Sequence, residues 1–382
     1  MTALALACGA LSLALFVWSY AIYPALISRL AEKRGVAAVS PDPAPPLSVE
    51  VIVSAADEEA VIGARVADLL AQQGVADLRV SIGCDGCRDR TADRAREAAA
   101  GNPAVHVVEF RERRGKAAVL NDLVAASQAD VLVFTDANTR FDPGAVAALV
   151  ASLAPGENGA ACGRLLFETG AQADRTPEAS LWDRETRLKE AEGALGVCVG
   201  ANGAIYAARR SMVEPLPLDT TSMDDFLIPA RAARSGKRVV FSSAAVARED
   251  AARNVASEMR RRFRIGIGAG QVLRRERWLL AAPRHPLLTL AFVSRKAARW
   301  LAPLFLLIAA TLALFSPSLR PEGAAVWIAA VLACALAWAR SSLPGAAGRL
   351  YYFGVLNVAL ALGVAAGLAG YSRPVWTRTA RA

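Results

Sequence analysis

Two oxygen-bearing side chains stand two residues apart directly after a short apolar run. The run covers residues 131–134, and Asp136 and Asn138 follow it. Ligands of open α/β sheets bind at the carboxyl ends of strands, and carboxylate and amide oxygens suit Mg²⁺ or Mn²⁺. The spacing therefore indicates a divalent cation that also holds a diphosphate. The alternative is a plain exit from a strand, in which Asp142 caps a helix with Pro143 at its first position.

Carboxylates also stand at two other turns of the chain. Asp85 lies between Cys84 and Cys87, whose C-x-x-C spacing is shared by half-zinc sites and redox motifs. No second pair of cysteines follows in the sequence, so reduced thiols facing the cytosol are the preferred interpretation. Asp224 and Asp225 open a predicted helix, where one of them is expected to stabilise the helix N-terminus. The other then needs a different role.

These residues lie in a region where short apolar runs alternate with amphipathic segments. The pattern predicts strands at residues 49–54, 78–83, 105–109, 131–134 and 160–167, and a glycine-broken strand at 197–206. It predicts helices at residues 58–73, 89–100, 116–124, 143–153, 178–192 and 222–234. Such alternation predicts an α/β fold, a mostly parallel sheet with helices on both faces. The sequence contains neither a G-x-G-x-x-G turn nor a G-x-x-x-x-G-K-[ST] loop, which argues against a dinucleotide-binding or NTPase site.

The composition indicates a membrane protein with a soluble middle. Of the 382 residues, 54% are hydrophobic, and the mean hydropathy is +0.31. Residues 1–28 are expected to form a retained transmembrane anchor. A cleaved signal peptide is the competing interpretation, but the basic residues Arg29, Lys33 and Arg34 follow the apolar segment instead of preceding it. This asymmetry favours a cytoplasmic location for the next domain, residues 47–250.

Basic residues stand beside apolar ones throughout residues 251–299. The net charge of +9 could suggest a nucleic-acid partner, but this arrangement instead predicts helices that lie on an anionic inner leaflet. Solvated basic helices are the alternative. Residues 300–370 then contain three apolar segments, at 301–315, 324–339 and 351–369. If the domain is cytoplasmic, three spans after it would put the tail, residues 371–382, outside. The arginines of the tail favour the inside. A re-entrant segment, a dip at 287–293 or an exception to the charge rule would reconcile the two.

Taken together, these segments resemble the family 2 glycosyltransferases, specifically the membrane-embedded, polysaccharide-synthase-like branch. The resemblance covers residues 49–264. Its motifs are the first strand and acidic turn at 51–59, a D-G-S-type turn at Asp85, G-K-x-x-x-L-N at 115–121, the D-x-D position at 136–138, a glycine motif at 200–203, the T-E-D position at 223–225 and the Q/R-x-x-R-W position at Arg261 and Arg264. Each motif alone is weak, but their order along the chain is specific.

The resemblance implies a GT-A-type, Rossmann-like domain over residues 47–250 and a role for each matching residue. Donor binding is expected at Ser54, Glu58, Asp85, Lys116, Asp136, Arg261 and Arg264. The acceptor side is expected at Gly200, Ala201, Asn202 and Asp224, the catalytic base at Asp225, and Mg²⁺ or Mn²⁺ at Asp136 and Asn138. Three residues depart from the motifs: Asn138 replaces the second Asp, Ile265 follows Arg264 where Trp is expected, and Met223 replaces Thr.

The implied activity is transfer of a sugar with inversion, from a nucleotide-diphosphate donor expected to be a UDP-sugar. The acceptor is expected to be a polysaccharide or a lipid-linked glycan, in exopolysaccharide or cell-envelope synthesis at a bacterial-type inner membrane, with the catalytic domain in the cytoplasm. One alternative is a transferase that adds a single sugar to a lipid carrier. Another is a catalytically silent membrane scaffold of a synthase complex. Ile265 argues against processive polymerisation, and no motif identifies an export partner.

Overall fold

The computed structural model describes residues 1–34, 47–168, 177–250, 255–338 and 345–375. The chain divides into two compact units. One unit contains the described residues of Ile27–Ala251 together with Pro374 and Val375, and we call it the sheet unit. The other contains Met1–Leu26 and the described residues of Ala252–Arg373, and we call it the helical unit.

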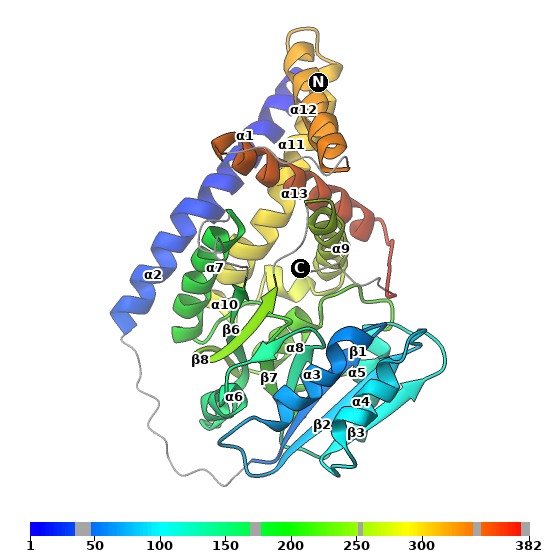
Figure 1. The fold of residues 1–382 in the computed structure, drawn as a ribbon. Helices are drawn as coiled ribbons and strands as arrows, with labels where there is room; N and C mark the ends of the chain where they lie inside the picture. Colours follow the sequence, from blue (N-terminus) through cyan, green and yellow to red (C-terminus); the bar gives the residue numbers. More distant parts are fainter. Residues whose placement is uncertain (35–46, 169–176, 251–254, 339–344, 376–382) are drawn as a thin grey trace. The chain divides into compact units, whose positions relative to one another are not determined.

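The sheet unit is built on one eight-stranded mixed sheet (Figure 1). Its strands are β1 (Val49–Ala55), β2 (Leu78–Asp85), β3 (Val105–Phe110), β4 (Val131–Asp136), β5 (Arg140–Phe141), β6 (Asn158–Glu168), β7 (Tyr206–Arg209) and β8 (Arg238–Asp250). Their spatial order is β3-β2-β1-β4-β7-β6-β8-β5. The first four strands of this order are parallel, as predicted, and β6 is parallel to β8. However, β7 is antiparallel to both of its neighbours, and β5 is antiparallel to β8.

Helices cover both faces of this sheet. They are α3 (Glu59–Leu70), α4 (Thr91–Ala99), α5 (Lys116–Ala126), α6 (Ala145–Leu153), α7 (Pro177–Ala194) and α8 (Asp224–Arg234). Alternate side chains of β1, β2 and β4 share one core cluster with α3, α4 and α6, and Figure 1 shows α3 and α4 over this face. Leu123 of α5 packs at Gly83 of β2, on the opposite face. Strands covered on both faces are apolar at successive positions, which explains residues 131–134.

Successive strands are added to the sheet on both sides of β1. The chain runs from β1 to β2 and β3 on one side, and then returns to β4 on the other side of β1. Such a topological switch point leaves a crevice at the carboxyl ends of the two strands, where ligands of open α/β sheets bind. Ser54 of β1 and Asp136 of β4 are register partners at this end. The topology therefore brings two predicted site residues to the expected ligand position.

The predicted strand at residues 197–206 is wrong. Strand β7 begins only at Tyr206, and the residues before it form an irregular segment with single bridges at Val197 and at Asn202. Gly200 has a positive φ of 77°, a conformation that suits glycine and ends extended pairing there. The glycines therefore mark a loop rather than a strand.

The predicted start of the helix after Asp142 is also wrong. Helix α6 begins at Ala145, two residues later than predicted, and Gly144 precedes it with a φ of 94°. The Asp142 carboxylate does not cap this helix but binds the Arg248 guanidinium, at 2.6 and 3.0 Å. Arg248 lies on β8, a strand that the sequence analysis missed because its mixed Ala, Ser and charged residues show little alternation.

Three helices of the described chain are long and apolar enough to cross a membrane: Thr2–Arg34, Pro286–Leu314 and Leu350–Leu368. The first comprises α1 (Thr2–Val17), a π-helical turn (Trp18–Ile22) and α2 (Tyr23–Arg34). The second comprises α10 (Pro286–Ala291), a π-helical turn (Phe292–Ala297) and α11 (Ala298–Leu314), so residues 287–293 begin one long helix with the predicted span at 301–315. The predicted span at 324–339 corresponds to α12 (Arg320–Trp338), which is not among the three.

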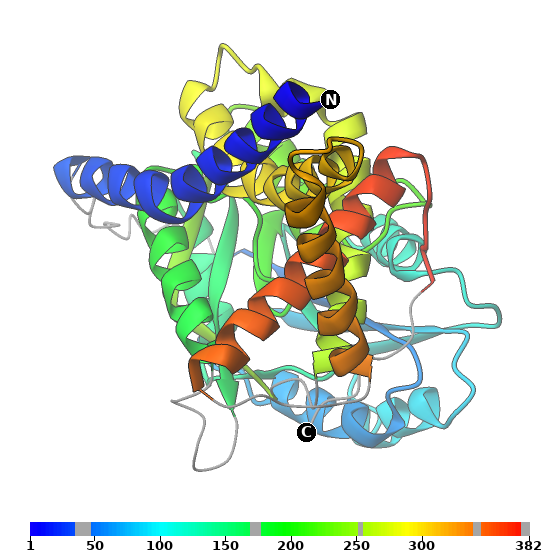
Figure 2. The same ribbon diagram turned by 90° about the horizontal axis from the view of Figure 1, so that it is seen from above.

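Helices α1 and α11 lie side by side within the helical unit (Figure 2). The Ser12 hydroxyl donates a hydrogen bond to the Ala302 carbonyl oxygen at 2.8 Å. Directly after the end of α1, the Trp18 indole N–H donates to the Ser294 hydroxyl at 2.8 Å. Such bonds between apolar helices each contribute about 0.6 kcal/mol and align the two helices.

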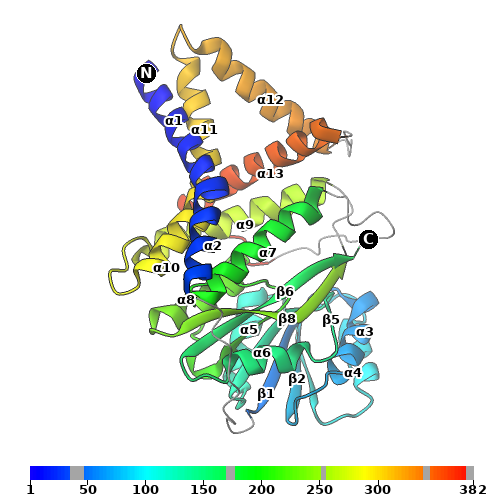
Figure 3. The same cartoon turned by 90° about the vertical axis from the view of Figure 1, so that its left-hand side faces the viewer.

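Helix α9 (Val255–Arg275) packs closely along α13 (Gly345–Leu368), as Figure 3 shows. Gly266 and Gly270 of α9 face Gly363 and Gly367 of α13, so two G-x-x-x-G segments meet. A Cβ added at Gly270 would lie 2.5 Å from the Val364 carbonyl oxygen. Small residues permit this close approach of two helix backbones. One side of the basic helix predicted at the membrane surface is thus buried in protein, and its contact with lipid stays a prediction.

Candidate active site

Lys116 lies between two carboxylates at the carboxyl edge of the sheet. Its ammonium nitrogen is 3.0 Å from Asp136 Oδ1 and 3.1 Å from Asp224 Oδ2. Asp136 ends β4, and Asp224 is the first residue of α8, so the lysine joins two elements that are distant in sequence. Burial opposes the charge of Lys116, but the carboxylates of Asp136 and Asp224 outweigh burial and raise the pKa of its ammonium. Lys116 is therefore a cation at neutral pH.

The loop before Lys116 is held by Asp85. Its two carboxylate oxygens accept hydrogen bonds from the backbone N–H groups of Arg114, at 2.7 Å, and Gly115, at 2.9 Å. Asp85 is fully buried, and Gly115 has a φ of 92° that a side chain would strain. The predicted donor-binding residue Asp85 thus fixes the start of α5, and direct contact between Asp85 and a nucleotide stays a prediction.

The carboxylates of Asp136 and Asp225 both lie close to Gly203. A Cβ added at Gly203 would lie 3.6 Å from Asp225 Oδ2 and 3.9 Å from Asp136 Oδ2. The Ala201 backbone N–H donates to the Asp225 carbonyl oxygen at 2.8 Å, which joins the glycine segment to the start of α8. The predicted base, the predicted metal ligand and the predicted acceptor segment are therefore neighbours in space, although Asp136 and Asp225 are 89 positions apart in the sequence.

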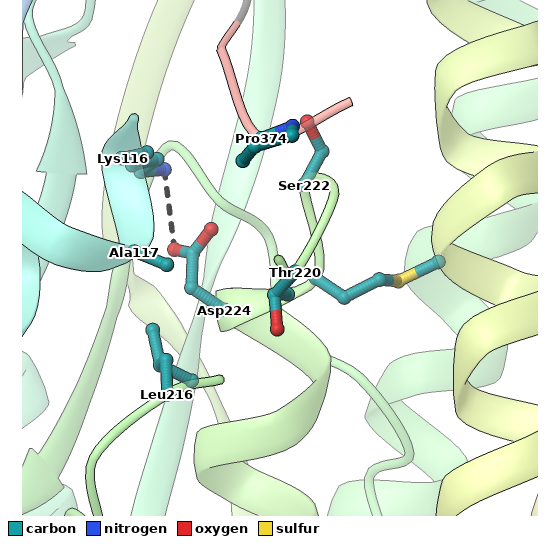
Figure 4. A pocket seen from close by; sticks show the side chains of 8 residues that line it. Lys116, Ala117, Leu216, Thr220, Ser222, Asp224 and Pro374 are labelled. Carbon is teal, nitrogen blue, oxygen red and sulfur yellow. Dashed lines mark ion pairs between the residues drawn. The ribbon is translucent and has the colours of Figure 1, made fainter. Parts of the chain in front are cut away.

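A small hollow lies beside this cluster within the sheet unit (Figure 4). Its lining includes Lys116, Asp224, Thr220, Ser222 and Pro374, and Figure 4 shows the ion pair of Lys116 with Asp224 at its side. The Thr220 hydroxyl oxygen is buried without a hydrogen-bond partner among the described residues. A buried polar atom of this kind is costly unless a ligand or water satisfies it. The hollow is thus suited to a polar ligand.

Ser54 and Glu58, predicted to bind the donor, lie at the exit of β1. The buried Ser54 hydroxyl has no partner within the described part of the chain, so it is available to a ligand. Glu58 directly precedes α3, where its backbone N–H donates to the Thr91 hydroxyl at 2.8 Å. Between them, Asp57 has a φ of 58° and binds Arg113 at 2.6 Å. The turn that joins β1 to α3 is therefore held by side chains of the following strand-to-helix turns.

The donor set at Asp136 and Asn138 fits a divalent cation. Asp136 Oδ1 binds Lys116, while Oδ2 points to the space above Gly203. The Asn138 amide nitrogen is buried with no hydrogen-bond partner in the described residues. That nitrogen is a hydrogen-bond donor and not a metal ligand, whereas the carboxylate oxygens of Asp136 and the amide oxygen of Asn138 are of the type that Mg²⁺ and Mn²⁺ prefer. These two residues would hold such an ion.

Cys84 and Cys87 form no disulfide in this structure, and their reduced state in the cytosol stays a prediction. Cys87 also lies with Asp57 and Asp89 in a group whose ligand atoms are within 4.8 Å of one another. Both carboxylates already accept hydrogen bonds: Asp57 from Arg88 and Arg113, and Asp89 from Thr91 and from the Glu59 backbone. The geometry therefore supports a hydrogen-bonded turn at this place and not a second metal site.

Hydrogen bonds within the sheet unit hold the predicted acceptor segment in place. The Asn202 amide donates to the Gly163 carbonyl oxygen at 2.7 Å, and its oxygen accepts a hydrogen bond from the buried Lys189 ammonium. Asn202 thus supports the segment, and its contact with an acceptor stays a prediction. Asp224, also predicted on the acceptor side, contacts Lys116, and its acceptor-side role stays a prediction. The acceptor-side roles of Gly200 and Ala201 likewise stay predictions.

Arg261 and Arg264 lie on α9, in the helical unit. Arg261 pairs with Glu258 at 3.3 Å, one turn earlier on the same helix. These two arginines thus belong to a different compact unit from Lys116 and Asp136, and their contact with donor phosphates stays a prediction.

Sequence analysis missed two residues that support the site. The fully buried Arg65 donates to the Thr135 hydroxyl at 2.7 Å, and that hydroxyl donates to the Ala204 carbonyl oxygen at 2.7 Å. Burial lowers the pKa of Arg65 to about 10, and Asp68 partly offsets this effect. Tyr206 donates to Asp224 at 2.9 Å. An arginine in an apolar helix face is a detectable signal in the sequence, whereas Tyr206 reads as an ordinary strand residue.

Comparisons with known proteins agree with this arrangement. A family model described as "Glycosyl transferase family 2" matches residues 50–211, and one described as "Glycosyl transferase family group 2" matches residues 131–341. The chain is 36% identical over 107 residues to the succinoglycan biosynthesis protein ExoU of Rhizobium meliloti. That match covers 28% of this chain and 31% of the relative, so it spans about a third of the relative's length.

The fold is similar to a solved structure of the mannosyltransferase PcManGT from Pyrobaculum calidifontis, in complex with GDP-Man and Mn²⁺. The two chains are 22% identical with a TM-score of 0.66, over 94% of this chain and 99% of that one. At this identity the likeness concerns the fold alone. The second family model covers more than half of the chain and includes β4, Asp136 and Asp225. This protein therefore belongs to the family 2 glycosyltransferases.

Proposed function

We propose that this protein is a membrane-bound inverting glycosyltransferase that moves a sugar from a nucleotide-diphosphate donor to a polysaccharide or lipid-linked acceptor. One observation carries the proposal: Asp136 and Asp225 face the same point above Gly203, with Lys116 bound to Asp136. This edge of the sheet is also the topological switch point between β1 and β4. A metal ligand, a fixed cation and a candidate base are the groups that such a transfer needs.

In the proposed reaction an acceptor hydroxyl attacks the anomeric carbon from the face opposite the diphosphate. Asp225 accepts the hydroxyl proton as the new C–O bond forms. The bond from the anomeric carbon to the diphosphate oxygen breaks, and its electron pair leaves with the diphosphate. Lys116 offsets the negative charge of this leaving group. A divalent cation at Asp136 and Asn138 would supply Lewis-acid stabilisation of the same charge.

The metal requirement can be tested by removal. Treatment of the purified full-length protein with EDTA is expected to abolish nucleotide release from an activated sugar, because the charge on the diphosphate then lacks its counter-ion. Added Mn²⁺ or Mg²⁺ should restore the release. Unchanged release after complete chelation would contradict the assignment of Asp136 and Asn138 as ligands.

A donor screen tests the proposed function itself. We propose a UDP-sugar on the basis of the motifs, whereas the structural relative was solved with GDP-Man. Nucleotide release should therefore be scored across UDP- and GDP-sugars with membrane lipids as the acceptor source. Release from neither class, with a folded protein and Mn²⁺ present, would argue for a catalytically silent scaffold. The presence of Asp85, Asp136 and Asp225 argues against that alternative.

Product length separates the two acceptor classes. The succinoglycan biosynthesis relative favours a cell-envelope glycan, and Ile265 favours the addition of a single sugar to a lipid carrier over polymerisation. A radiolabelled donor would give either a small lipid-extractable product or a polymer retained at the chromatographic origin. We expect the small product.

We propose that the catalytic domain is cytoplasmic, at a bacterial-type inner membrane, and three helices that are long and apolar enough to cross a membrane are compatible with this. If Thr2–Arg34, Pro286–Leu314 and Leu350–Leu368 all cross, the tail returns to the side that holds residues 47–250. The tail then lies inside, as Arg373, Arg378 and Arg381 favour, and α12 is the non-crossing segment. Pro374 belongs to the sheet unit, which agrees with this arrangement. Labelling of single cysteines introduced at each end of the spans would test it.

The space above Gly203 provides a steric test of the shared site. A Gly203→Ala methyl group would contact Asp225 Oδ2 and Asp136 Oδ2 at ordinary distances, so the fold should be retained. The methyl group would occupy the space between the two carboxylates, and a substrate bound there would be displaced from Asp225. Because misplacement by about 1 Å can cost roughly 10²-fold, we expect kcat to fall about 10- to 100-fold.

Gly156→Ala is the matched control for Gly203→Ala. A Cβ added at Gly156, in the same unit, meets nothing within 4 Å. This variant should transfer sugar at the wild-type rate. Equal rates for Gly203→Ala and the wild type, measured by nucleotide release, would refute a substrate position above Gly203.

A further inference from the structure

We propose that Tyr206 is a positioning residue for donor binding, whose hydroxyl orients Asp224 so that this carboxylate holds Lys116 beside Asp136. The inference rests on the proposed function, since Lys116 is taken to bind the donor diphosphate. It assigns a role to a residue that no glycosyltransferase motif described above includes.

The position of Tyr206 is set by the sheet. Tyr206 begins β7 and is the register partner of Phe134 on the antiparallel strand β4. The two rings are stacked, with centroids 4.8 Å apart and planes 13° apart, and both side chains are buried. Stacked rings on paired strands leave little freedom at χ1 and χ2. The packing of the ring therefore fixes the position of the phenol oxygen.

At that place the hydroxyl donates a hydrogen bond to Asp224. The donor–acceptor distance is 2.9 Å, and the accepting atom, Oδ2, is the same oxygen that lies 3.1 Å from Lys116 Nζ. Burial, together with the charges of Asp224 and Asp225, raises the pKa of the Tyr206 phenol. The phenol is therefore neutral and remains a donor at the pH where the enzyme works. Asp224 is itself buried, so a lost donor is not simply replaced by solvent.

A chain of polar contacts then runs from the sheet to the candidate donor site. Tyr206 fixes Asp224, Asp224 holds Lys116, and Lys116 reaches Asp136 Oδ1 at 3.0 Å. Packing needs only the ring of Tyr206, which phenylalanine would also supply. The hydroxyl adds nothing to the stack with Phe134, so its function lies in the bond with Asp224. Without that bond, Asp224 and Lys116 can adopt other rotamers, and the ammonium is no longer preset for a diphosphate.

The test is nucleotide binding by the full-length Tyr206→Phe variant. The probes are UDP and GDP with Mn²⁺, and the measured quantity is the equilibrium Kd. Hydrogen bonds to charged groups contribute enough to predict a Kd about 10-fold higher than wild type, with the acceptor KM unchanged. In a Lys116→Met background the same substitution should change Kd by less than about 2-fold, because the contacts form one chain.

Three further variants keep the result interpretable. Asp224→Asn should reproduce the weaker binding, and the Asp224→Asn, Tyr206→Phe double variant should be no weaker than the worse single variant. Tyr23→Phe removes another fully buried phenol oxygen, from the helical unit, and should leave Kd unchanged. Gel filtration and thermal melting of each variant show whether it is folded.

Several results would overturn the inference. An unchanged Kd in folded Tyr206→Phe would do so, as would the same loss in the wild-type and Lys116→Met backgrounds. A raised acceptor KM with normal nucleotide Kd would place Tyr206 on the acceptor side instead. If the wild-type chain bound neither nucleotide, the proposed function itself would fail, and this inference with it. That outcome differs from nucleotide binding by the wild type with the same Kd in Tyr206→Phe, which would refute this inference alone.

Discussion

Replacement of Asp225 with asparagine is expected to lower kcat by roughly 10²- to 10⁴-fold, the range typical for loss of a general base. The amide cannot accept the proton that leaves the acceptor hydroxyl. Asn has nearly the shape of Asp, so the contact of Ala201 with the Asp225 carbonyl oxygen should persist. The Kd for nucleotide, measured in the presence of Mn²⁺, should stay within about 3-fold of wild type, since a group that acts on the acceptor contributes mainly to kcat.

The adjacent residue supplies the control for Asp225→Asn. Asp224 is buried and bound to Lys116 and Tyr206, whereas Asp225 Oδ2 faces the space above Gly203. Asp224→Asn should therefore weaken nucleotide binding, while Asp225→Asn should leave it intact and stop transfer. Turnover of Asp225→Asn at the wild-type rate would refute its role as the base. Loss of nucleotide binding in that variant would place Asp225 on the donor side.

The second large effect is expected on stability, from Gly367→Ala in α13. A Cβ at this position would overlap the Ile267 carbonyl oxygen and lie 2.9 Å from its carbonyl carbon and 3.0 Å from Gly270 Cα. These are backbone atoms of α9 and cannot move aside as a side chain does. Overpacking of this kind costs about 1–3 kcal/mol or more. We expect a clear drop in the melting temperature of the detergent-solubilised protein.

Gly354→Ala, in the same helix, is the matched control for Gly367→Ala. A Cβ added at Gly354 meets nothing within 4 Å, so only the helix propensity changes. That change should be neutral or stabilising, by about 0.5–1 kcal/mol. Equal melting temperatures for Gly367→Ala and Gly354→Ala would refute close packing of α9 on α13 through their glycines.

Much of the parallel half of the sheet could be predicted from local pattern. Strands β1 to β4 are short and largely apolar, and helices separate β1, β2, β3 and β4 in sequence, which is the pattern of a parallel sheet. The pattern does not give the full strand order, because β4 lies beside β1 and not beside β3. Strands β5 and β8 could not be predicted in the same way. Their pairing partners are distant in sequence, and β8 has few apolar residues in alternation. The register of such strands depends on contacts that periodicity does not encode.

The G-x-x-x-G segments show a signal that was present but not used. Gly266 and Gly270 are visible in the sequence, as are Gly363 and Gly367. Small residues at this spacing are common in apolar helices and do not name a partner. Only the structure brings the two pairs together and buries α9 along α13.

The sequence by itself determined the kinds of residue that the chemistry requires and the strand ends at which they stand. The order of Lys116, Asp136 and Asp225 in motifs was enough to indicate the family, and the apolar segments indicated the membrane. Tertiary structure alone showed that Asp224 pairs with Lys116 and that Tyr206 donates a hydrogen bond to Asp224. The physical reason is that a motif records residue type and spacing. Which of two adjacent carboxylates turns towards a cation depends on the helix start and on side chains from strands far away in sequence.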